Sequence, residues 1–122
     1  MYLIDTNVFL EYLLDQDKAS SVTEFFEKTD CKKLWVTDFC LHSIGIVFAR
    51  NGLIDKYQTF LSGDISDNGI RILSLHPMEI DILVDAVHMY NLDFDDVYQY
   101  SIARIYHLKI VSFDRHFDKT DM

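Results

Sequence analysis

The first thirteen residues, MYLIDTNVFLEYL (residues 1–13), show the pattern from which the fold is predicted. A short apolar run at residues 2–4 stops at the three polar residues Asp5, Thr6 and Asn7. Apolar side chains then recur at helical spacing, at Val8, Phe9, Tyr12 and Leu13. This pattern predicts a strand, a polar turn and a helix.

The same alternation of strand and helix continues along the chain. Further strands are expected at residues 34–36, 70–73 and 109–112, and helices at residues 17–28, 39–49, 53–61, 77–90 and 93–106. Residues 39–49 carry almost no charge, so we expect that helix to be buried on most sides. Helices between successive strands imply right-handed crossovers. The predicted fold class is therefore α/β, a three-layer α/β/α sandwich around a parallel sheet of about four strands, in one domain over residues 1–122.

Composition and charge exclude several classes of protein. Apolar residues make up 49% of the 122 residues and charged residues 25%, with four glycines and one proline, which is typical of a globular domain. The net charge of −9, from 11 basic and 20 acidic residues, argues against a broad basic surface for nucleic acid. Any such contact must be local or bridged by cations. Cys31 and Cys40 lack the spacing of a zinc site or a disulfide framework. With no signal peptide and no apolar segment long enough to span a bilayer, we expect a cytoplasmic protein.

Acidic residues follow several of the predicted strands. Because ligands bind beyond the carboxyl ends of parallel strands, these positions are the first candidates for a site. They are Asp5, Asp38 and Asp114, joined by Asp93, Asp95 and Asp96 at the start of a predicted helix. Clustered carboxylates repel one another unless a hard divalent cation neutralises them, so Mg²⁺ or Mn²⁺ is expected, in a site suited to phosphodiester hydrolysis. The same residues also suit ordinary helix N-termini, and both interpretations stay open.

Three segments resemble the PIN domain family, and in particular its VapC-like toxins and their solitary relatives. Residues 2–10, YLIDTNVFL, are similar to the family's opening strand with its Asp-Thr-Asn. Residues 92–100, LDFDDVYQY, resemble its third acidic motif, and residues 110–117, IVSFDRHF, its closing motif. The three occur in the family's order and span nearly the whole chain.

The resemblance implies a set of site residues. Asp5, Asp96 and Asp114 would be the catalytic and metal-binding carboxylates, and the neighbouring polar groups of Thr6, Asn7 and Ser112 would orient them. Asp93 is expected to cap the helix that follows it. The family's usual glutamate on the helix after the second strand is replaced by Ser43, with His42 beside it. Serine supplies no negative charge, so metal affinity should fall.

The resemblance also implies a function. We expect an Mg²⁺- or Mn²⁺-dependent ribonuclease that cleaves RNA, dimerises, and serves as the toxin of a toxin–antitoxin pair held inactive by a partner protein. The alternative is a PIN fold that has lost catalysis with its glutamate and persists as a binding or regulatory module. A third possibility, from a different class, is a receiver-like or phosphatase-like domain with Asp5 as phosphoacceptor. His116 stands where the family often has an acid, with Asp118 close by, and a short final strand is expected to be missing from a chain ending at Met122.

Overall fold

A parallel four-stranded sheet lies at the centre of the computed structural model, which describes residues 1–114. The strands are β1 (Tyr2–Ile4), β2 (Leu34–Thr37), β3 (Arg71–Leu73) and β4 (Lys109–Val111), in the order β3-β2-β1-β4. Leu3 of β1 pairs with Trp35 of β2 on one side and with Ile110 of β4 on the other. The predicted α/β class and strand number are confirmed. The expectations for His116, Asp118 and a missing final strand fall outside the described residues.

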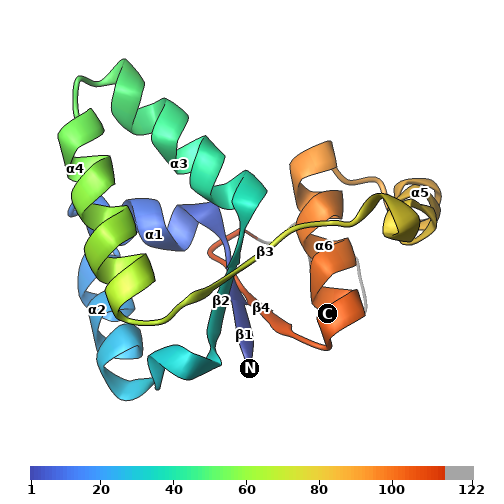
Figure 1. The fold of residues 1–122 in the computed structure, drawn as a ribbon, viewed down its shortest axis with the longest axis horizontal. Coiled ribbons are helices and arrows are strands. Elements are labelled where there is room, and N and C mark those ends of the chain that lie inside the picture. Colours follow the sequence, from blue (N-terminus) through green and yellow to red (C-terminus); the bar gives the residue numbers. More distant parts are fainter. Residues whose placement is uncertain (115–122) are drawn as a thin grey trace.

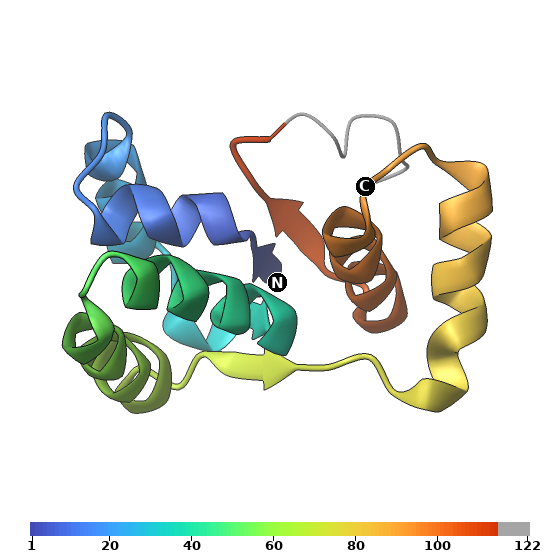
Figure 2. The same ribbon diagram turned by 90° about the horizontal axis from the view of Figure 1, so that it is seen from above.

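Helices cover both faces of the sheet and make the three layers (Figures 1 and 2). One side carries α1, α2, α3 and α4, and the other carries α5 and α6. Their bounds are α1 (Thr6–Leu13), α2 (Ala19–Lys28), α3 (Asp38–Arg50), α4 (Ile54–Thr59), α5 (Ile80–Met89) and α6 (Phe94–Tyr106). Two 3₁₀ turns, η1 (Cys31–Lys33) and η3 (Pro77–Glu79), and a π-helix, η2 (Phe60–Asp67), complete the described elements. In that part of the chain, no helix is both long and apolar enough to cross a bilayer.

Strand β1 is buried on both faces, which places it at the centre of the core. Successive strand side chains point to opposite faces. Ile4 belongs to the cluster on the side of α1 and α3, and Leu3 packs with Ile102 and Ala103 of α6. Both β1 side chains are inaccessible to solvent. The apolar run that opens the chain is thus shared by two cores.

Helix α3 is buried on one side only, so the expectation of burial on most sides is wrong. Ile44 and Phe48 are fully buried, whereas Ile46 is 52% exposed and His42 is also exposed. The reason is the position of α3 in an outer layer, where a single helix face contacts the sheet (Figure 2). A sequence with few charges did not show that the opposite face meets solvent.

The segment after α4 also differs from expectation. A helix ending near residue 61 and a polar loop were predicted, but the chain continues as the π-helix η2. Its two buried residues, Phe60 and Ile65, lie five positions apart. A π-helix has i→i+5 hydrogen bonds, and this wider turn brings residues five apart to one face. The π-helix therefore turns both side chains into the core.

Candidate metal site at the carboxyl edge of the sheet

Asp5 is a buried carboxylate with three hydrogen-bond donors around it. It directly follows β1, acts as the N-cap of α1, and is 6% exposed. Its Oδ1 accepts hydrogen bonds from the Thr6 backbone N–H at 2.7 Å and from Nε2 of Gln99 at 2.6 Å. Its Oδ2 accepts a hydrogen bond from Oγ of Ser112 at 2.6 Å. A carboxylate has about four acceptor positions. Among the described contacts, Oδ1 has two donors and Oδ2 has one, so the remaining acceptor position is on Oδ2.

Ser112 connects the end of β4 to the start of α1. Besides donating to Asp5, its Oγ accepts from Nδ2 of Asn7 at 3.2 Å and from the Asp114 backbone N–H at 2.9 Å. The Phe113 backbone N–H donates to Oδ1 of Asn7 at 3.2 Å. Ser112 therefore contacts both Asp5 and Asn7, and the backbone of Asp114 is joined to Asp5 through a single hydroxyl group.

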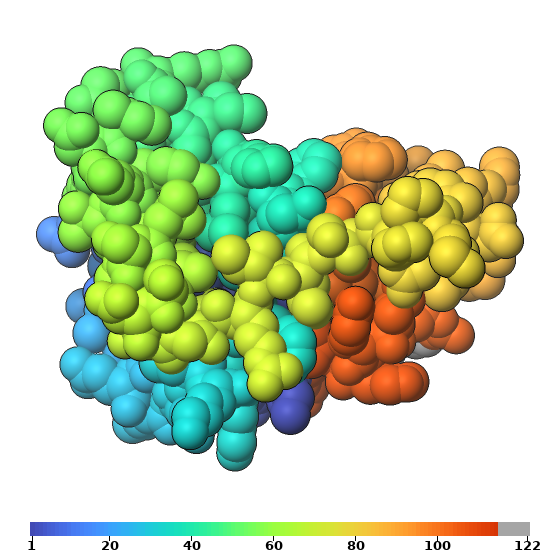
Figure 3. All heavy atoms as spheres, viewed as in Figure 1, coloured from blue at the N-terminus to red at the C-terminus, as the bar shows by residue number. Residues whose placement is uncertain are grey.

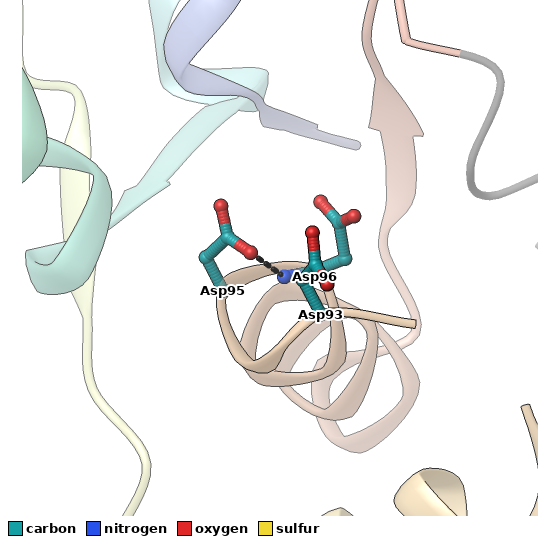
Figure 4. Close-up of side chains that lie close together, drawn as sticks. All are labelled: Asp93, Asp95 and Asp96. Carbon is teal, nitrogen blue, oxygen red and sulfur yellow. Dashed lines mark hydrogen bonds between the residues drawn. The ribbon is translucent and has the colours of Figure 1, made fainter. Parts of the chain in front are cut away.

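Three carboxylates gather at the start of α6. Ligand oxygens of Asp93, Asp95 and Asp96 all lie within 4.8 Å of one another, and the side chains project to the same side of the helix (Figure 4). Asp96 is 5% exposed, while the other two are exposed. The Asp96 backbone N–H donates to Oδ1 of Asp95 at 3.0 Å. Within residues 1–114, neither Asp5 nor Asp114 belongs to a metal-binding group of this compactness.

The prediction that Asp93 caps α6 is only half correct. Asp93 occupies the N-cap position with extended backbone angles, but its side chain makes no capping hydrogen bond. Its carboxylate lies instead within reach of Asp95 and Asp96. The acidic first turn thus brings its carboxylate oxygens together as a group.

Gln99 is the site residue that the sequence analysis missed. It is 4% exposed and lies three residues after Asp96, on the same face of α6. Its Nε2 contacts Asp5, which is 94 positions away in the chain. The signal available in the sequence was a polar amide one helical turn after an acidic residue of the motif.

Thr6 and Ser43 do not use their hydroxyl groups on the carboxylates. Thr6 donates its hydroxyl to Sγ of Cys40 at 3.1 Å, and only its backbone N–H contacts Asp5. Ser43 donates its hydroxyl to the Phe39 carbonyl at 3.0 Å, one turn earlier in α3. A serine inside a helix commonly bonds to the carbonyl four residues back. Thr6 therefore contacts the Asp5 carboxylate through its backbone N–H and not through its hydroxyl. The hydroxyl of Ser43 bonds within its own helix.

The neighbouring thiol of Cys40 is unsuited to nucleophilic chemistry. Burial raises its pKa to about 12; the hydrogen bond from Thr6 lowers it and the negative charge of Asp5 raises it further. A nucleophilic cysteine requires the thiolate form. Cys40 is therefore a packing residue of α3, and both Cys40 and Cys31 are free thiols.

Asp38 lies apart from this network and joins α3 to α6. Its Oδ1 accepts hydrogen bonds from the Tyr98 hydroxyl and the Phe39 backbone N–H, both at 2.8 Å. The Tyr98 hydroxyl in turn accepts from the Leu75 backbone N–H at 2.8 Å, and burial raises the Tyr98 pKa. The surface is hollowed between α3 and the α5–α6 side of the molecule (Figure 3).

The chemistry of these donors suits a hard cation. Every candidate ligand is a carboxylate oxygen, as Mg²⁺ and Mn²⁺ prefer. Asp5 keeps an acceptor position on Oδ2, and Asp96 is buried within the compact acidic group of α6. The residues present therefore fit a divalent metal. By contrast, the burial of Asp5 argues against a phosphoacceptor role.

Comparison with known families matches the PIN domain over residues 2–122. The chain belongs to the PIN domain family. The match covers the segments that carry Asp5, Asp96 and Asp114, so the resemblance noted in the sequence extends over nearly the full length of this PIN domain. No curated protein matches the sequence of this PIN domain significantly.

Solved structures share the fold of this PIN domain. VapC20 of Mycobacterium tuberculosis, described as a sarcin-ricin loop cleaving toxin, aligns with a TM-score of 0.80 and 8% identity over 97% of this chain and 93% of that one. A toxin–antitoxin complex from Klebsiella pneumoniae aligns with a TM-score of 0.76 and 14% identity over 96% of this chain and 90% of that one. FitAcB from Neisseria gonorrhoeae aligns with a TM-score of 0.77 and 19% identity over 100% of this chain and 94% of that one. At these identities the likeness establishes the fold alone.

Proposed function

We propose that this PIN domain is a ribonuclease that depends on Mg²⁺ or Mn²⁺, with Asp5, Asp96 and Asp114 as its metal-binding and catalytic carboxylates. One observation carries the proposal. Asp5 is a buried carboxylate held by donors from α1, from α6 and from the segment after β4. These contacts place the end of β1 beside the two other segments that supply acids.

Each residue of the site has a distinct task. A bound divalent cation would polarise the phosphodiester, lower the pKa of the attacking water and stabilise the leaving oxygen. Asp5 would contribute its remaining acceptor position on Oδ2, and Asp96 and Asp114 would bring charge from α6 and from the end of β4. Ser112 and Asn7 keep the segment after β4 in place. The negative charge of the site makes its contact with RNA dependent on the cation.

We further propose that the protein is the toxin of a toxin–antitoxin pair and forms a homodimer. Support comes from the fold neighbours, one described as a sarcin-ricin loop cleaving toxin and another as a toxin–antitoxin complex. The net charge of −9 leaves few basic residues for phosphate contacts, and two subunits side by side would form a groove that neither makes alone.

One observation favours a second candidate function, a PIN domain that binds without cleaving. Ser43 stands where the resemblance implies a glutamate, and its hydroxyl bonds to the Phe39 carbonyl. The site then has one carboxylate fewer, which lowers its affinity for the cation. The variant Ser43→Glu separates the two functions: it raises metal affinity and activity if the site is weakened, and changes neither if the site has been lost.

The decisive experiment is cleavage of a labelled pool of RNA by the purified protein with Mg²⁺, with Mn²⁺ and with a chelator. Asp96→Asn is prepared in parallel, with Asp81→Asn, an exposed residue of α5, as the matched control. The ribonuclease proposal expects cation-dependent cleavage by the wild type and Asp81→Asn, and its loss in Asp96→Asn. Equal background in every reaction would contradict that proposal and favour the binding module.

A further inference from the structure

We propose that Gln99 is a positioning residue that orients the Asp5 carboxylate for metal binding, an inference that rests on the proposed function. The carboxamide of Gln99 donates from Nε2 to Oδ1 of Asp5 at 2.6 Å. Both side chains are more than nine-tenths buried. A short contact between buried groups holds each in one orientation, because neither has solvent as an alternative partner.

The hydrogen bond leaves the metal-facing part of Asp5 available. Gln99 and the Thr6 backbone N–H both bond to Oδ1, so that oxygen has two donors, while Oδ2 has one, from Ser112. The acceptor position that remains is therefore on Oδ2. Gln99 thus helps to decide which oxygen of Asp5 is presented to a cation.

The identity of the side chain also matters. A lysine or arginine at this position would supply a donor, but its charge would cancel the negative charge that attracts a cation. Glutamine supplies the donor without a charge. Because Gln99 lies one turn after Asp96 on α6, the same helix turn that carries one candidate ligand orients another.

The second polar atom of Gln99 points to a role beyond packing. Its Oε1 is buried and has no hydrogen-bond partner among residues 1–114. Leaving a buried acceptor without a partner costs free energy, so a residue chosen for stability alone would be apolar or fully bonded here. An amide oxygen is also a group to which hard cations and their water ligands bind. The unpartnered atom belongs to the same carboxamide that contacts Asp5.

The test measures Mn²⁺ affinity by calorimetry and thermal unfolding in chelator, so that metal binding and folding are read separately. The variant Gln99→Met keeps the length of the side chain but removes both polar atoms. Gln99→Asn keeps the amide on a chain one carbon shorter. The matched control is Ser101→Ala, a buried residue of the same helix whose hydroxyl bonds to the Val97 carbonyl. Asp96→Asn tests the proposed function itself.

We expect Gln99→Met and Gln99→Asn to weaken Mn²⁺ binding by about 10- to 100-fold, as loss of groups behind metal ligands commonly does. Ser101→Ala should bind Mn²⁺ with an affinity within about twofold of the wild type, which we count as no change. One outcome would overturn the role of Gln99 and leave the proposed function standing. In that outcome the wild type binds Mn²⁺, Asp96→Asn binds it more weakly, and both Gln99 variants bind it as tightly as the wild type. An equal loss in Ser101→Ala would assign the effect to helix packing and also overturn the role of Gln99. If the wild type does not bind Mn²⁺, both proposals fail together.

Discussion

The hydroxyl of Ser112 donates a 2.6 Å hydrogen bond to Oδ2 of Asp5, joining residues 107 positions apart. Ser112 follows β4 and Asp5 follows β1, and these two strands are neighbours in the sheet. The parallel pairing of β1 with β4 brings their carboxyl ends to the same edge. A contact between the two ends of the chain thus comes from the register of the sheet.

Replacing Ser112 with alanine should therefore lower stability as well as metal affinity. Loss of a hydrogen bond to a charged group costs about 1.5–3 kcal/mol. The variant also removes the acceptor for the Asp114 backbone N–H. Urea unfolding monitored by circular dichroism measures the change. Ser62→Ala is the control, since that exposed hydroxyl bonds within its own helical segment. A similar cost in both variants would contradict the special role of Ser112.

The one-sided burial of α3 predicts different costs for one substitution at two positions. Ile44→Ala should destabilise the fold by about 2–5 kcal/mol, because it opens a cavity in the core. Ile46→Ala, two residues further on, should stay within about 0.5 kcal/mol of the wild type, because its side chain is largely exposed. Unfolding free energies from urea titration decide this. Equal losses would mean that the outer face of α3 is covered in solution.

Cys40 should reduce stability in alkaline solution. Its folded pKa, about 12, lies above the ordinary value of 9.0. Between these two values the unfolded chain releases the thiol proton and the folded chain keeps it, so stability falls as pH rises above 9, by at most about 1.4 kcal/mol per pH unit. Cys40→Ala should flatten the decline between pH 9 and 10, where tyrosines also begin to ionise but contribute equally to the wild type and the variant. Thermal unfolding across this range measures the slope, and an unchanged slope would contradict the prediction.

Asp64 on the π-helix should destabilise the protein at neutral pH. Burial raises its pKa above the ordinary 3.8. The folded state therefore holds the proton more tightly than the unfolded state. Stability is lost as pH rises from the unfolded pKa to the higher folded pKa. Asp64→Asn should recover less than about 1 kcal/mol at pH 7, since partial exposure screens the charge, and nothing at pH 3. Asp67→Asn, exposed on the same π-helix, is the control for both pH values. A gain from Asp64→Asn that persists at pH 3 would assign the effect to something other than its charge.

Much of the fold was predictable because its signals are local. The apolar runs at residues 2–4, 34–36 and 109–112 differ from the observed strands by no more than one residue. Pro77 begins the 3₁₀ turn before α5, as its fixed backbone angle favours. The π-helix η2 was not predictable in this way. Its polar residues suggested a loop, and only the burial of Phe60 and Ile65 accounts for the wider turn.

The candidate site divides along the same line. The sequence alone showed that acidic residues follow the strands and lie at the start of α6. It could do so because the strand–turn–helix pattern depends on residues that are neighbours in the chain. The tertiary structure decided which polar groups meet them: Gln99 contacts Asp5, and the Thr6 hydroxyl bonds to Cys40. Asp93 occupies the N-cap position, but its carboxylate lies near Asp95 and Asp96 and makes no capping hydrogen bond. The physical reason is that side-chain direction depends on how helices pack against the sheet. Hydrogen bonds between residues about a hundred positions apart depend on that packing.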